Sequence, residues 1–129
     1  MSLPSVSVVV PLHQAESWIA QTLRSALNQT HPPLEILVVD NNSRDRGPEI
    51  ARGFGGPVRV IEEPTPGACH ARMAGLAQAR GEAIMFLDAD DLLGPEALEG
   101  MAEALAADPG AVALCDWSRL EWVDAGAAE

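Results

Sequence analysis

Three aspartates, Asp88, Asp90 and Asp91, follow directly after an apolar run at residues 84–87. In an Asp-x-Asp pair the carboxylates lie about 5–7 Å apart, where like charges repel by roughly 3 kcal/mol at an effective dielectric constant of about 20. A shared proton or a bound cation relieves this repulsion. Because a hard divalent ion prefers oxygen ligands and keeps positions open for phosphate oxygens, the run predicts an Mg²⁺ or Mn²⁺ site that holds a diphosphate.

Helix capping is an alternative explanation for part of this run. Carboxylates stabilise the N-terminus of a helix, and Pro95 stands where the next helix is expected to start. Capping accounts for Asp91 but does not require Asp88. Both explanations stay open on the residues alone.

The elements that position the aspartates follow from the hydrophobic pattern. Continuous apolar runs predict buried strands, and apolar residues that repeat every three or four positions predict helices. The expected strands are residues 6–10, which Pro11 ends, 34–39, 58–61, 82–87 and 111–115; the expected helices are residues 16–30, 48–54, 68–79 and a segment from Pro95 onward. This alternation predicts an α/β fold with a Rossmann-like, doubly wound, mostly parallel sheet.

In such a sheet, ligands bind beyond the carboxyl ends of the strands. The turns expected there carry mostly acidic and amide side chains, so we expect them to form one site. These residues are Pro11, Leu12, His13, Gln14 and Glu16 after the first strand, Asp40, Asn41, Asn42 and Ser43 after the second, Pro66 and Gly67 after the third, and Asp88, Ala89, Asp90 and Asp91 after the fourth. Trp18, on the first helix, is expected in the core.

The composition excludes several other classes of phosphate-binding protein. The formal net charge is −11, and the eight Lys or Arg residues are all Arg. The absence of Lys excludes a P-loop, a response-regulator receiver domain and a haloacid-dehalogenase-like phosphatase, and no Gly-x-Gly-x-x-Gly follows the first strand. The acidic charge argues against nucleic acid and against an anionic membrane surface as partners.

Five stretches of the sequence, taken in order, carry a family resemblance. They are "VSVVVPLHQAE", "TLRSALNQTHPPLEILVVDNNSRD", "GPEIA", "VRVIEEPTPGACHARMAGLAQARGEAIMFLDADD" and "DP". With these stretches the chain resembles the N-terminal, nucleotide-sugar-binding half of family 2 glycosyltransferases of the GT-A fold. The resemblance runs from about residue 6 to residue 117.

The resemblance implies a role for each part of the predicted site. Pro11, Leu12, His13 and Glu16 would lie along the base and ribose of a nucleotide sugar. Asp40 and Asn41 would hold the base and ribose. Gly67 and Arg72 would lie near the diphosphate; the alternative for Arg72 is a surface ion pair with Glu82 or with a strand-end aspartate. Asp88, with Ala89 beside it, would contact the ribose or the metal, and Asp90 would be the principal ligand of Mn²⁺ or Mg²⁺.

The implied activity is inverting transfer of a sugar from a nucleotide-sugar donor, with a UDP-sugar as the first candidate. The acceptor would be an unknown saccharide or lipid-linked molecule, as in cell-surface polysaccharide biosynthesis. The alternative is a non-catalytic nucleotide-sugar-binding or interaction module derived from the same fold. The departures from the family pattern are His13-Gln14 in place of Tyr-Asn, Asn41 in place of a second Asp, and Met73 in place of Asn, and they bear on which nucleotide is bound.

The whole of residues 1–129 is expected to form a single domain that is shortened relative to the family, with residues 117–129 as a flexible tail. No catalytic base is visible, and we expect it beyond Glu129. A sheet edge exposed by the short chain would allow a homodimer. Cys69 and Cys115 are expected to be buried free thiols, which fits the cytoplasm, with any attachment to the inner face of the membrane made through other parts or partners.

Overall fold

A computed structural model describes residues 2–108 of the 129-residue chain. The predicted fifth strand at 111–115, the predicted tail at 117–129 and Cys115 lie outside the described residues. Within the described part, no helix is both long enough and apolar enough to cross a membrane. Cys69 is a free thiol, but it is exposed, so the expectation that it is buried is wrong.

Four strands alternate with four helices along residues 2–108. They run in the order β1 (Val6–Leu12), α1 (Ile19–Leu27), β2 (Glu35–Asp40), α2 (Gly47–Arg52), β3 (Val58–Glu62), α3 (Ala68–Gln78), β4 (Ala83–Phe86) and α4 (Ala97–Ala107). The strands form one sheet in the order β3-β2-β1-β4, and every neighbouring pair is parallel. The predicted α/β fold with a Rossmann-like parallel sheet is therefore confirmed.

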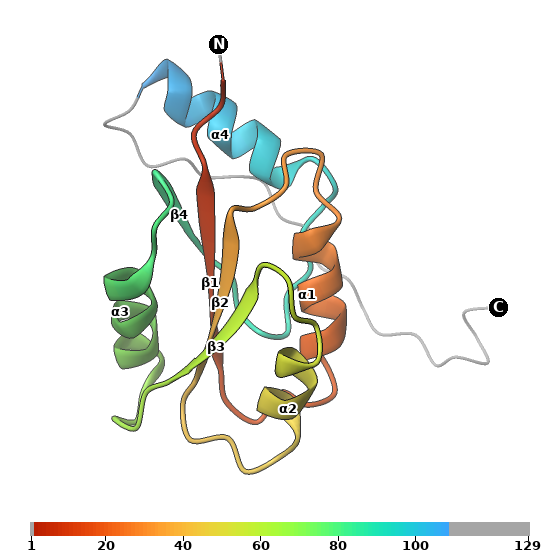
Figure 1. Ribbon diagram of the computed structural model, residues 1–129, viewed down its shortest axis with the longest axis vertical. Coiled ribbons are helices and arrows are strands. Elements are labelled where there is room, and N and C mark those ends of the chain that lie inside the picture. Colours follow the sequence, from red (N-terminus) through yellow and green to blue (C-terminus); the bar gives the residue numbers. More distant parts are fainter. Residues whose placement is uncertain (1, 109–129) are drawn as a thin grey trace, which may run out of the picture.

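Helices cover both faces of the sheet (Figure 1). Helix α3 lies on one face, α1 and α2 lie on the other, and α4 lies near the end of the sheet where β1 begins. The side chains of β1 alternate between the two faces, as expected for a strand. Val8 and Val10 join the core beneath α1, α2 and α4, whereas Val9 joins Leu37, Val39 and Ala71 beneath α3.

Helix α3 packs very close to the sheet because Gly75 faces it. A Cβ atom placed on Gly75 would lie 2.3 Å from Cγ1 of Val9 and 3.3 Å from Cγ2 of Val39. The first distance is far below van der Waals contact, so only glycine fits at this point. The close approach holds α3 against β1 and β2.

Pro11 lies inside β1 and does not end it, so the predicted strand boundary is wrong. Strand β4 pairs with β1 only as far as Val9, whose carbonyl accepts a 2.9 Å hydrogen bond from the N–H of Leu87. Alternate residues of a strand direct their backbone groups to the same neighbour, so the nitrogen of Pro11 faces the side where β4 has already ended. The missing N–H removes no ladder bond, and β1 continues beside β2 to Leu12.

The buried carboxylate of Glu35 joins neighbouring segments at the end of the sheet where the strands begin. Its Oε2 accepts hydrogen bonds from the Ser7 hydroxyl at 2.7 Å and from the backbone N–H of Arg80 at 2.6 Å. Side-chain nitrogens of Arg59 and Arg80 lie 3.8 and 3.6 Å from Oε1. Burial acts to raise the pKa of Glu35, but the hydrogen bonds and the positive charges outweigh it, and the pKa is lowered from its ordinary value.

Candidate functional site

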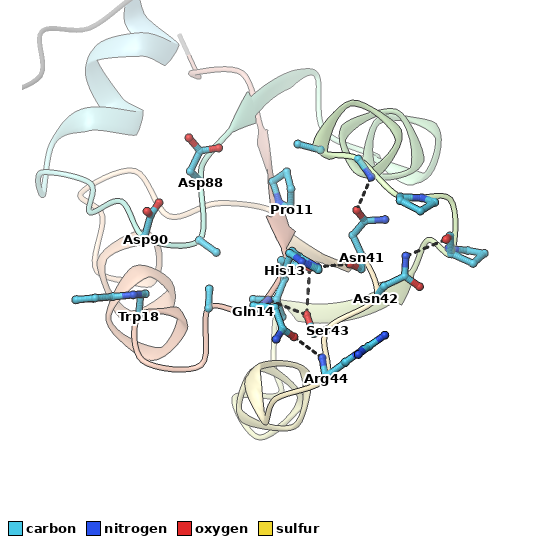
Figure 2. A pocket seen from close by; sticks show the side chains of 17 residues that line it. Pro11, His13, Gln14, Trp18, Asn41, Asn42, Ser43, Arg44, Asp88 and Asp90 are labelled. Atoms are coloured by element: carbon cyan, nitrogen blue, oxygen red, sulfur yellow. Dashed lines mark hydrogen bonds between the residues drawn. The ribbon is translucent and has the colours of Figure 1, made fainter.

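A cleft of about 1220 Å³ lies beyond the carboxyl ends of β1, β2 and β4 (Figure 2). Most of the predicted site residues line it. They are Pro11, Leu12, His13, Gln14, Asn41, Asn42, Ser43, Pro66, Gly67, Asp88, Ala89 and Asp90. The order of the strands in the sheet thus brings together turns that are far apart in the sequence, which is what the rule for ligand sites in parallel sheets predicts.

The predicted site residues that do not line the cleft are Glu16, Asp40, Arg72 and Asp91. Glu16 joins the turn after β1 to the start of α2, because its Oε1 accepts a 2.8 Å hydrogen bond from the backbone N–H of Arg46. Asp40 shapes the turn after β2, because its Oδ1 accepts a 3.0 Å hydrogen bond from the backbone N–H of Ser43.

Arg72 extends from α3 towards the acidic end of β4. One of its guanidinium nitrogens, Nη2, lies 3.4 Å from Oδ1 of Asp88, and both side chains are substantially exposed. This is the surface ion pair with a strand-end aspartate that the sequence left open as an alternative. An exposed pair of this kind adds little stability and leaves the guanidinium within reach of an anion at the rim of the cleft.

The acidic turn consists of Asp88, Ala89, Asp90 and Asp91. The backbone N–H of Asp91 donates a 3.0 Å hydrogen bond to the carbonyl of Asp88, and the side chain of Ala89 packs into the core. Each aspartate offers a carboxylate oxygen, and the three oxygens lie within 4.8 Å of one another on exposed side chains. This donor set fits a hard divalent cation.

Asp91 belongs to this cluster and does not cap a helix. Helix α4 begins at Ala97 and its N-cap residue is Glu96, well beyond Asp91, so the capping explanation is wrong. Partial burial, and then the negative charges of Asp90 and Asp88, raise the pKa of Asp91. The part of the shift that comes from Asp90 and Asp88 reflects the repulsion that a cation in the turn would relieve.

Asn41 lies on the opposite side of the cleft and closes the loop before α3. Its Nδ2 donates hydrogen bonds to the carbonyl oxygens of Glu63 at 2.7 Å and Thr65 at 2.8 Å. Its Oδ1 accepts a 2.9 Å hydrogen bond from the backbone N–H of Gly67. Both amide hydrogens are used, and a carboxylate could not supply them. The amide therefore sets the shape of this wall of the cleft.

His13 lines the cleft between the two walls. Its Nδ1 lies 2.7 Å from the carbonyl oxygen of Asn41. A carbonyl only accepts, so Nδ1 carries the proton and donates it to this bond. In the neutral ring, Nε2 is then an acceptor. This contact ties the turn after β1 to the turn after β2.

Backbone strain is concentrated at the cleft. Among the described residues, Gln14 at φ 52° and Asn42 at φ 62° are the non-glycine residues with positive φ, and both line the cleft. Their side chains hold the neighbouring turns, with Gln14 accepting from the N–H of Arg44 and Asn42 donating to the carbonyl of Pro64. Strained residues of this kind gather where a structure is built around a ligand.

Several residues of the cleft were not predicted individually. Trp18 is 40% exposed and lines the cleft at the start of α1, so its expected place in the core is wrong. Its position just before the apolar face that begins at Ile19 is the signal that could have placed it outside the core. Arg44 also lines the cleft and was not predicted.

Comparison with known proteins defines the class to which this fold and site belong. The family model described as glycosyl transferase family 2 matches residues 7–125. The chain therefore belongs to family 2 of the glycosyltransferases. EpsH of Bacillus subtilis (strain 168) is 33% identical over 129 residues, and the match covers 98% of this chain and 37% of EpsH. Glycosyltransferase AglE of Haloferax volcanii is 38% identical over 95 residues, covering 69% of this chain and 31% of AglE.

Solved structures show the same relationship. S. aureus TarS 1-349 in complex with UDP matches with a TM-score of 0.73 and 30% identity, over 80% of this chain and 32% of that one. Mannosyltransferase PcManGT from Pyrobaculum calidifontis, in complex with GDP-Man and Mn²⁺, matches with a TM-score of 0.74 and 30% identity, over 82% and 33%. The fold is thus that of GT-A glycosyltransferases, and the chain spans about a third of the length of these proteins.

Proposed function

We propose that this chain forms the donor-binding half of an inverting glycosyltransferase that uses a nucleoside diphosphate sugar. The proposal rests on one observation: two walls of different chemistry face each other across the cleft. One wall is the turn with three clustered carboxylates, and the other is the hydrogen-bonded loop held by Asn41. A diphosphate bound to a divalent ion suits the first wall, and a base with its ribose suits the second.

In this proposal Asp90 and Asp88, joined by Asp91, hold Mn²⁺ or Mg²⁺. When bound, such an ion neutralises charge on the departing nucleoside diphosphate and acts as a Lewis acid. Arg72 would move from its ion pair with Asp88 to the diphosphate, because the pair is exposed and weak. Gly67, at φ 123°, lets the chain turn into α3 beside that position.

The residues on the other side of the cleft would hold the nucleoside. Pro11, Leu12 and His13 would lie along the base and ribose, with Asp40 and Glu16 fixing the turns from beside the cleft. Asn41 would act on the nucleoside through the loop that it holds more than by direct contact, because both of its amide hydrogens are already used. Ala89 would line the site between the metal ligands.

A UDP-sugar is the first candidate donor. Among the structural relatives, TarS was solved with UDP and with UDP-GlcNAc, whereas PcManGT was solved with GDP-Man. Several other properties stay predictions from the sequence. They are the acceptor, the inverting course of the reaction, the single domain of residues 1–129, a catalytic base beyond Glu129, a homodimer and a cytoplasmic location.

Calorimetric titration of the 129-residue chain with UDP, GDP and dTDP, each with and without Mn²⁺, tests the proposal. We expect binding of UDP that requires Mn²⁺ and weaker binding of the other two nucleotides. Equal, null heats for all three nucleotides would contradict a donor site. Transfer or hydrolysis of a donor sugar by the chain alone would contradict the alternative of a non-catalytic binding module.

A further inference from the structure

Helix α1 carries a buried polar stripe. The polar stripe consists of Thr22 and Ser25 in α1 and Gln29 just after it, spaced so that they lie on one side of the helix. Thr22 is completely buried and Gln29 is 6% exposed. Buried polar side chains require hydrogen-bond partners, and the partners of this stripe all lie in α1 or in the segment from Ala89 to Leu98.

The contacts of the polar stripe follow the segment between β4 and α4 in order. The hydroxyl of Thr22 donates a 2.7 Å hydrogen bond to the carbonyl of Ala89. The hydroxyl of Ser25 accepts at 3.0 Å from the N–H of Leu93. Gln29 donates at 2.7 Å to the carbonyl of Gly94 and accepts at 3.0 Å from the N–H of Leu98. Backbone groups without a strand or helix partner are thus satisfied by the side chains of the polar stripe.

The stripe is itself held in place. The hydroxyl of Ser25 donates at 2.7 Å to the carbonyl of Thr22, and the Gln29 amide donates at 2.9 Å to the carbonyl of Ser25. The side chains of Ser25 and Gln29 are therefore fixed to the helix as well as to the segment that they contact. A network in which every member is satisfied is rigid, because loss of one bond leaves a buried partner unpaired.

Thr22 acts at the acidic turn itself. The carbonyl that accepts its hydrogen bond belongs to Ala89, between Asp88 and Asp90. The acidic turn is otherwise closed by the bond between the N–H of Asp91 and the carbonyl of Asp88. The first bond fixes the turn to α1, and the second fixes its shape. Together they keep the carboxylate oxygens within 4.8 Å of one another despite their mutual repulsion.

We propose that Thr22 is a positioning residue for the divalent-ion site, acting through the carbonyl of Ala89. The inference rests on the proposed function, since it assumes that the acidic turn binds a metal ion. Without the hydroxyl, the Ala89 carbonyl loses its buried partner and the turn is free to spread its carboxylates apart. Removal of an outer hydrogen bond of this kind typically weakens metal binding by roughly ten-fold to one hundred-fold.

Mn²⁺ binding to the 129-residue chain, measured from the electron paramagnetic resonance signal of free Mn²⁺, tests this role. Thr22→Val keeps the size of the side chain and removes the hydroxyl, whereas Thr22→Ser keeps the hydroxyl. We expect Thr22→Val to raise the dissociation constant for Mn²⁺ by about ten-fold or more, and Thr22→Ser to bind close to the unchanged chain. Thr30→Val makes the same exchange at an exposed position next to the stripe and should leave the constant unchanged.

The outcomes distinguish a failure of the role proposed for Thr22 from a failure of the proposed function. Mn²⁺ binding by Thr22→Val that equals that of the unchanged chain overturns the role of Thr22 and leaves the metal site standing. Absence of Mn²⁺ binding by the unchanged chain, with and without UDP, overturns the proposed function and the positioning role with it. If Thr22→Val does not fold, Thr22→Cys replaces it: this weak donor should bind Mn²⁺ more weakly than Thr22→Ser, and equal binding overturns the role.

Discussion

The backbone N–H of Gly67 donates a 2.9 Å hydrogen bond to Oδ1 of Asn41, a residue that follows a different strand. Asn41 is 6% exposed, and its amide also donates to the carbonyls of Glu63 and Thr65. One side chain therefore joins the end of β2 to the whole loop between β3 and α3. The shape of one wall of the cleft depends on an amide at this position.

We expect Asn41→Asp to lower the free energy of unfolding by about 1–3 kcal/mol at pH 7, because a carboxylate would face two carbonyl oxygens without a hydrogen to donate. A protonated carboxyl recovers one donor, so the pKa of the new aspartate should be raised in the folded chain. The deficit should then be smaller near pH 4 than at pH 7. Urea unfolding at both pH values measures the difference.

Asn42→Asp is the matched control for that change. Asn42 makes a single side-chain donation, to the carbonyl of Pro64 at 2.9 Å, and is exposed. Aspartate also tolerates the positive φ found there. We expect a change within about 0.5 kcal/mol. Equal losses for the two variants would contradict the special role of Asn41.

Gly75→Ala tests the close packing of α3. The added methyl would lie 2.3 Å from Cγ1 of Val9, so the helix must shift or the strand must distort. We expect a loss of about 1–3 kcal/mol, typical of overpacking. In Gly100→Ala, also within a helix, the new methyl meets nothing within 4 Å, so this control should gain about 0.5–1 kcal/mol. Stabilisation by both changes would show that α3 can move away freely.

The fold could be predicted from the sequence because the hydrophobic pattern is strong and unambiguous. Val8, Val9 and Val10 are all fully buried, as a strand covered on both faces requires. The boundary at Pro11 could not be predicted, because it depends on where the neighbouring strand β4 stops. The place of the candidate site could also be predicted, because the turns that follow parallel strands all lie at one edge of the sheet.

The hydrogen bonds within the site could not be predicted, because they join segments that are distant in the sequence. Thr22 looks like an ordinary helix residue until the carbonyl of Ala89 is placed against it. Asn41 looks like a residue free to bind a ligand until the loop before α3 uses its amide. Trp18 is expected in the core as a residue of the first helix, but it is the N-cap residue of α1 and lines the cleft.

The stability of the folded chain should depend on pH through Glu35. Its pKa is lowered in the folded state, so its contribution is fully present above the pKa of an unfolded glutamate, about 4.3, and is lost as the pH falls through the folded value. Glu35→Gln should be less stable than the unchanged chain at pH 7, and the difference should narrow with decreasing pH below about 4.3. Thermal unfolding from pH 7 to pH 3 measures this difference in stability between the variant and the unchanged chain.

Glu62→Gln provides the comparison for Glu35. It removes a carboxylate from the same sheet that is exposed and lies 3.6 Å from Arg52. An exposed pair adds little, so the profile of this variant should run parallel to that of the unchanged chain. A gap between Glu35→Gln and the unchanged chain that stays constant across the range would show that Glu35 acts by packing and not by charge.

Asp90→Asn tests the acidic turn directly. Removing one of three clustered charges should abolish Mn²⁺-dependent binding of UDP while the melting temperature stays the same or rises, because the repulsion is relieved. Calorimetry and thermal unfolding give the two readings. Glu103→Gln removes an exposed charge from α4 and should change neither. A large fall in melting temperature for Asp90→Asn would mean that Asp90 is structural.

Arg72→Met separates a role in diphosphate binding from a role in the surface ion pair with Asp88. The pair is exposed at both ends, so the melting temperature should hardly change. If the guanidinium reaches the diphosphate, the variant should bind UDP more weakly, by roughly ten-fold for one lost charge-assisted hydrogen bond, and bind uridine as the unchanged chain does. Arg52→Met removes the arginine of another exposed pair and should leave both affinities unchanged. An equal loss for UDP and uridine would place Arg72 outside the diphosphate contacts and make it a support of the cleft as a whole.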